Sequence, residues 1–144
     1  MNQSRHSDAT YAHILAAMNE MIEESVYHTE TFAYTLKIHH NDNAAAIFTH
    51  ACKQFRADQA IVMNETVSME LPSIPPWEKP FPNYQHPSSL LMNAHYLMNE
   101  AEAREIINSM TMIHQDFYNY LLETQSDSNM IKILKTLIDN ERFF

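Results

Sequence analysis

Apolar residues alternate at spacings of three and four along the first 68 positions, the spacing of an amphipathic helix. One stripe predicts a helix over about Asp8–His39, through Ile14, Met18, Met21, Ser25, His28, Phe32 and Leu36. A turn at Asn41–Asn43 follows, where Asp42 is expected to cap the next helix. A second stripe predicts that this next helix spans Ala44–Ser68.

All six prolines fall between Pro72 and Pro87. Proline fixes φ and removes a backbone donor, so residues 69–87 are expected to be an extended, semi-rigid connection. Trp77, Phe81 and Tyr84 favour a segment that packs along the helices, and a docked polyproline-type ligand is the alternative. A short helix is predicted over Pro87–Leu97.

Two further helices are predicted after the connection. Asn99 and Glu102 form a capping-box pattern for a helix that runs to about Thr124. A turn at Gln125–Ser128 leads into a last helix. We therefore expect one all-α domain over residues 1–144, in which antiparallel hairpins (8–68 and 98–144) are joined by a long Pro/aromatic-rich crossover (69–97) into a four-helix bundle.

The composition agrees with helices and limits the partners. The chain has no glycine, which the tight turns of β-hairpins usually need. Its net charge is −9 without a cluster of Lys and Arg, so we expect no nucleic-acid and no membrane partner. No apolar run is long enough to span a bilayer and no signal peptide is recognisable, which predicts a cytoplasmic protein. The single Cys52 is predicted to be a buried thiol.

An offset of 86 residues relates the two halves of the chain. It carries His28 to His114, Leu36 to Leu122 and the turn residue Asn41 to Asp127. A fixed-offset echo indicates a duplicated supersecondary unit, here a helical hairpin.

The bundle architecture, together with the run from Phe117-Tyr118 through Asp127 to Leu137–Phe144, resembles the ferritin-like superfamily, and within it rubrerythrin-like domains. The resemblance implies a di-iron centre with Glu and Glu-x-x-His ligands on the four helices. At those positions this chain has Ser25, Phe55-x-x-Asp58, Thr111 and Glu141-x-x-Phe144. Only Glu141 is retained, so the resemblance implies a degenerate ligand set, and an ordinary di-iron oxidoreductase is not expected.

Four polar residues interrupt the inward stripes, one on each helix: His28, Asp58, His114 and Glu141. Counting from the turns puts His114 level with Glu141 and His28 level with Phe55, with Asp58 about one helical turn away. Two imidazoles and one or two carboxylates are suitable ligands for Fe²⁺, Zn²⁺ or Mn²⁺. A hydrogen-bonded polar layer that needs no metal is the other interpretation.

These observations leave two main hypotheses. The protein binds a transition metal in the bundle core through His28, Asp58, His114 and Glu141, or it is a metal-free structural or interaction protein. A homodimer is expected through methionine-rich faces that include Met92, Met98, Met110, Met112 and Met130. A small-molecule pocket beside the crossover is a third possibility. The sequence indicates no catalytic residue and no reaction.

Overall fold

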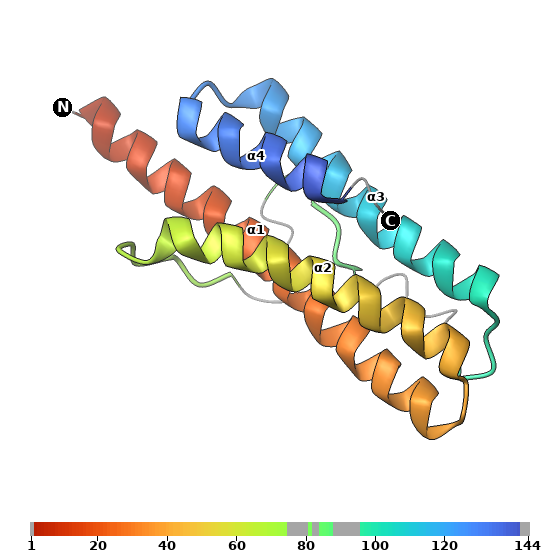
Figure 1. Ribbon diagram of the computed structural model, residues 1–144. Helices are drawn as coiled ribbons and strands as arrows, with labels where there is room; N and C mark the ends of the chain where they lie inside the picture. The colour runs from red at the N-terminus through yellow and green to blue at the C-terminus, as the bar shows by residue number, and fades with distance from the viewer. Residues whose placement is uncertain (1, 75–80, 82–83, 88–95, 142–144) are drawn as a thin grey trace.

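The computed structural model describes residues 2–74, 81, 84–87 and 96–141, with side chains from Thr10 onward. These residues form four helices and no strand: α1 (Asn2–Ile38), α2 (Asp42–Thr66), α3 (Glu100–Thr124) and α4 (Ser128–Asn140) (Figure 1). The predicted all-α class is confirmed. α1 begins earlier than expected and α2 ends two residues earlier. Most of the short helix expected over Pro87–Leu97 lies outside the described residues.

The turn between α1 and α2 differs from the prediction. Asn41, not Asp42, is the N-cap of α2, and its side chain makes no capping hydrogen bond. The Asn41 amide instead donates to the carbonyls of Tyr96 (3.1 Å) and Met98 (2.7 Å), which ties this turn to the segment before α3. Just before it, His40 takes a positive φ of 61°, a conformation that usually favours glycine at a helix C-terminus.

The start of α3 agrees with the sequence. The Asn99 side chain accepts a hydrogen bond from the Glu102 N–H, and the Glu102 carboxylate accepts one from the Asn99 N–H, which completes the capping box. Asp127 caps α4 in a similar way by accepting from the N–H of Met130.

Two separate clusters of apolar side chains form the core. One joins the first half of α1 to the second half of α3 and to α4, and includes Met18, Met21, Phe117, Leu121 and Leu134. The other joins the end of α1 to the first halves of α2 and α3, and includes Leu36, Phe48, Phe55, Ile107 and Met110. α4 contributes only to the first cluster because it is 13 residues long, whereas α2 and α3 each have 25.

The described part of the connection lies against the helices. Ile74 and Tyr84 are buried, and the rings of Phe81 and Tyr84 lie 5.6 Å and 5.4 Å from the Phe117 ring of α3. Trp77 lies outside the described residues.

The methionines do not form the exposed face that the sequence suggested. Met98, Met110 and Met130 are buried in the core and Met112 is exposed, while Met92 lies outside the described residues. Met is common in the cores of helical proteins because its flexible side chain fills irregular gaps. The prediction of a buried Cys52 is confirmed. Among the residues described, no helix is both long and apolar enough to cross a membrane.

Replacing Asn99 tests its role as the N-cap of α3. Asn99→Ala should lower the free energy of unfolding by roughly 0.5–2 kcal/mol, because the Glu102 N–H loses its acceptor. Urea denaturation followed by circular dichroism measures the change. Asn108→Ala, at an exposed position within the same helix, is the matched control and should cost nothing, since alanine has the higher helix propensity. Equal losses in both variants would contradict the capping role.

Candidate metal centre

A layer of buried polar side chains separates the two apolar clusters. Each helix contributes to it: Ser25 and Thr29 on α1, Asp58 on α2, Thr111 and His114 on α3, and Glu141 at the end of α4. On α1 and α2 the members of the two apolar clusters lie on opposite sides of these positions, and on α3 only Ile113 of the first cluster falls between Thr111 and His114. The layer is therefore a polar section between two largely separate parts of the apolar core.

His114 is the centre of this layer. Its Nε2 lies 2.7 Å from the Ser25 hydroxyl oxygen, and its Nδ1 lies 2.7 Å from Oε1 of Glu141. The Ser25 hydroxyl also lies 3.1 Å from the carbonyl oxygen of Met21, to which it can donate. The Phe55 ring, 4.9 Å away, covers the imidazole. Both ring nitrogens of His114 therefore have protein partners.

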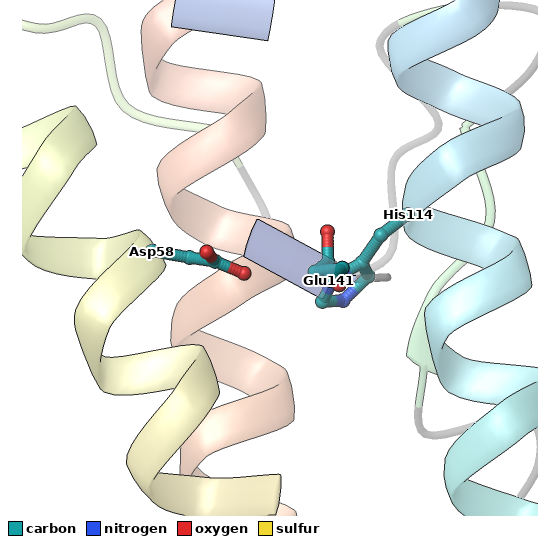
Figure 2. A group of neighbouring side chains, drawn as sticks. All are labelled: Asp58, His114 and Glu141. Atoms are coloured by element: carbon teal, nitrogen blue, oxygen red, sulfur yellow. The ribbon is translucent and has the colours of Figure 1, made fainter. Parts of the chain in front are cut away.

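Asp58 approaches the same place from α2. Its Oδ1 accepts a hydrogen bond of 2.5 Å from the amide of Asn140, the residue next to Glu141. Figure 2 shows Asp58 and His114 pointing toward each other from α2 and α3, with Glu141 beside the imidazole. One ligand atom from each of Asp58, His114 and Glu141 lies within 4.8 Å of the other two, and all three residues are buried.

Several buried oxygens in and beside the layer have no hydrogen-bond partner among the residues that the structure describes. They are Asp58 Oδ2, Glu141 Oε2, Thr111 Oγ1 and the Tyr118 hydroxyl, each buried. Leaving a buried polar atom without a partner costs about 1–3 kcal/mol. The two carboxylate oxygens are also the atoms that a metal ion would need. The layer thus carries unused ligand atoms beside a histidine.

The charges of the layer are poorly compensated. Burial raises the pKa of Asp58 from 3.8 to about 7, and the charge of Glu141 adds to the rise, whereas Asn140 and His114 act in the opposite direction. Burial also raises the pKa of Tyr118 well above 10.0, and Glu141 and Asp58 contribute to that rise. Among the described residues, no Lys or Arg contacts either carboxyl group. The environment therefore favours any added positive charge.

The end of α4 adds to this preference. Glu141 is the C-cap of α4, so the layer lies at the negative end of that helix dipole. Cations are stabilised at helix C-termini, by about 0.3–1 kcal/mol at exposed positions and more in partly buried ones.

His28 does not join the group, contrary to the expectation from the sequence. It is half-buried on α1, where its ring lies 5.2 Å from the ring of Tyr27. Burial lowers the pKa of His28, and nearby Glu24 raises it. α1 buries Ser25 and Thr29, a step of four, whereas the apolar spacing predicted a step of three from Ser25 to His28. Ser25 therefore takes the place opposite His114.

Three participants were not assigned to the site from the sequence. Ser25 was predicted as a stripe position and as a substituted family position but not as a site residue, although a serine inside an apolar stripe indicates a buried hydroxyl that needs a partner. Asn140 precedes Glu141, and its contact with Asp58 depends on how α4 ends, which the sequence does not reveal. Tyr118 belongs to the run that carries the family resemblance and was assigned no role, and its side chain is completely buried.

Comparisons of the chain with protein-family models, with curated proteins and with solved structures gave no match. The interpretation of the site therefore depends on its own geometry and charge.

The raised pKa of Asp58 predicts a pH-dependent stability. In metal-free protein the unfolded chain loses the Asp58 proton near pH 3.8 and the folded chain near pH 7, so this residue destabilises the fold increasingly across that interval. Asp58→Asn keeps the acceptor for Asn140 and removes the ionisation. It should stabilise the metal-free protein at pH 8 by up to about 4 kcal/mol, and the gain should vanish near pH 4.

Urea unfolding in the presence of a chelator, repeated across this pH range, measures the effect. Asp116→Asn, an exposed change on α3, is the control and should show no comparable trend. A gain for Asp58→Asn that is the same at every pH would contradict the assignment.

Proposed function

We propose that this protein is a ferritin-like bundle, made of two helical hairpins joined by a long crossover, that binds one divalent transition-metal ion in its core. Asp58, His114 and Glu141 are the proposed ligands, and Fe²⁺, Zn²⁺ and Mn²⁺ are the candidate ions. One observation carries the proposal. Three buried ligand side chains from three helices converge within 4.8 Å, and their carboxylates keep unpaired oxygens.

The donor set fits such an ion. Two ionised carboxylates neutralise a divalent charge, so the filled site would carry no net charge into the apolar core. Ligand atoms that bind at about 2.1 Å can lie at most about 4.2 Å apart. The 4.8 Å limit of the group exceeds this by little, which a small side-chain rotation would close. Glu141 and His114 already meet at 2.7 Å.

The resemblance noted in the sequence supports the same location. Of the six family ligand positions that it implies, four fall on Ser25, Asp58, Thr111 and Glu141, and all four residues are buried in this layer. The other two fall on Phe55 and on Phe144, which lies outside the described residues. Since only two carboxylates remain there, a single ion suits the layer better than a di-iron pair. A bound ion would supply Lewis acidity or, for iron, redox capacity; the protein residues would bind it, exclude water and set its charge.

Elemental analysis of protein purified without chelator tests the proposal. We expect about one equivalent of metal per chain, and its loss in His114→Ala, because the only nitrogen ligand is removed. His28→Ala is the matched control, since the structure places this histidine outside the group. Circular dichroism verifies that both variants fold. Metal that stays bound in His114→Ala, or that leaves in His28→Ala, would refute the ligand set.

A metal-free interaction protein is the second candidate. The observation in its favour is that His114 has a hydrogen-bond partner on each ring nitrogen without any ion. Such a protein would need a binding surface, and Tyr27, Tyr34 and Ile38 offer one, because all three are exposed on α1 at spacings of seven and four. A homodimer through this surface would replace the methionine face expected from the sequence.

Light scattering at several concentrations tests the dimer. Under this second candidate the mass should rise to that of two chains, and Tyr34→Glu should shift the equilibrium toward the monomer, since it puts a buried charge into the interface. Glu123→Gln, an exposed change on α3, serves as a control. A monomer at every concentration would eliminate this candidate.

A further inference from the structure

Tyr118 is a buried tyrosine whose hydroxyl group has no hydrogen-bond partner among the described residues. It lies on α3 one turn after His114, with the two rings 6.1 Å apart, and its side chain is completely buried. Its hydroxyl makes no hydrogen bond. Buried tyrosines usually find a partner for this group, because an unpaired hydroxyl costs about 1–3 kcal/mol.

Packing alone does not account for the hydroxyl. The preceding residue, Phe117, is also fully buried and fills its part of the core without a polar atom. Side chains on a helix lean toward its N-terminus, so the Tyr118 ring is directed back toward the turn that holds His114. The charges that act most strongly on this phenol are those of Glu141 and Asp58, the two carboxylates with unpaired oxygens.

The charge of the layer indicates when a phenolate would be needed. Asp58 and Glu141 together balance a divalent ion. A trivalent ion in the same place would leave one positive charge in an apolar core, which is costly without a counter-charge. Among the described residues in and directly beside the layer, Tyr118 is the remaining group acidic enough to supply a negative charge when a cation binds it, since metal coordination lowers the pKa of a ligand.

We propose that Tyr118 is a fourth protein ligand of the core site when the ion is Fe³⁺, so that the protein binds ferric iron as a tyrosinate complex. This inference rests on the proposed metal site. The phenol oxygen forms the bond to iron as its O–H bond breaks, and the proton passes to the buffer. No electron is transferred in this step. Fe³⁺ suits the phenolate because it is a hard cation that prefers anionic oxygen ligands.

The ligand set then distinguishes the ions. Zn²⁺ needs no third negative charge and would leave Tyr118 protonated. Fe³⁺ would recruit the phenolate and gain both a bond and charge balance. The site should therefore prefer the ferric ion more strongly than its Asp, His and Glu ligands alone would.

Loading of apoprotein with ferric nitrilotriacetate, and separately with zinc chloride, tests this inference. Wild-type protein should take up one Fe³⁺ and develop a visible phenolate-to-iron charge-transfer band, with phenolate ring vibrations in resonance Raman spectra. Tyr118→Phe should lose the band and bind Fe³⁺ about tenfold more weakly or worse, while its zinc affinity stays unchanged. The change removes a single oxygen that makes no hydrogen bond, so the fold should persist.

Tyr84→Phe is the matched control. Tyr84 is likewise buried with a hydroxyl that has no partner among the described residues, but the charges that act on it are those of Glu24 and Glu20. This variant should keep the band. A band that persists in Tyr118→Phe would overturn the inference.

The outcomes separate this inference from the proposal on which it rests. Fe³⁺ bound to wild-type protein without phenolate vibrations would overturn the role of Tyr118 and leave the metal site standing. Uptake of neither iron nor zinc would remove both. Should Tyr118→Phe fail to fold, a wild-type Raman spectrum without phenolate vibrations would still overturn the inference, and vibrations that persist in Tyr84→Phe would support it.

Discussion

Two carboxyl groups, those of Asp58 and Glu141, are buried inside an apolar bundle, and no described Lys or Arg side chain contacts them. The free-energy cost of burying these groups is the main constraint on the surrounding structure. An imidazole and a carboxamide each satisfy one oxygen, and the second oxygen of each carboxyl group stays unpaired. An uncompensated buried charge is among the most destabilising features a fold can contain. A protonated Asp58 relieves part of this cost, and a bound cation would relieve more. The same arrangement therefore explains both the raised pKa of Asp58 and the suitability of the layer as a cation site.

The helices and the cap of α3 were predictable because each depends on local chemistry, whereas the cap expected at Asp42 for α2 was wrong. The residues from Asn99 to Glu102 contain the complete capping box, and the apolar spacing alone locates four helices. Asp58, His114 and Glu141 were also predictable, since each interrupts an apolar stripe. His28 interrupts a stripe as well, yet it lies beside the core. A stripe can advance by three or by four residues at each step, and the position of the neighbouring helix decides which. The sequence pattern contains no information on that choice.

The partners of the buried groups were not predictable for a related reason. The contact between Ser25 and His114 joins residues 89 positions apart on different helices. The 86-residue echo would have paired His28 with His114, but the structure matches a serine with a histidine instead. The echo therefore does not predict which side chains meet in the layer. It also does not predict the lengths of the helices, because α2 has 25 residues and α4 has 13.

The last turn of α4 connects that helix to two others through adjacent residues: Asn140 bonds to Asp58 on α2, and Glu141 bonds to His114 on α3. A helix of 13 residues is marginal in water by itself and depends on its docking for stability. Because both hydrogen bonds are made to residues of the layer, a change in protonation or metal binding there would directly alter how α4 packs on the other helices. The backbone amides of α4 then form a local cooperative unit. The rate at which their hydrogens exchange with solvent therefore reports whether the buried layer is intact.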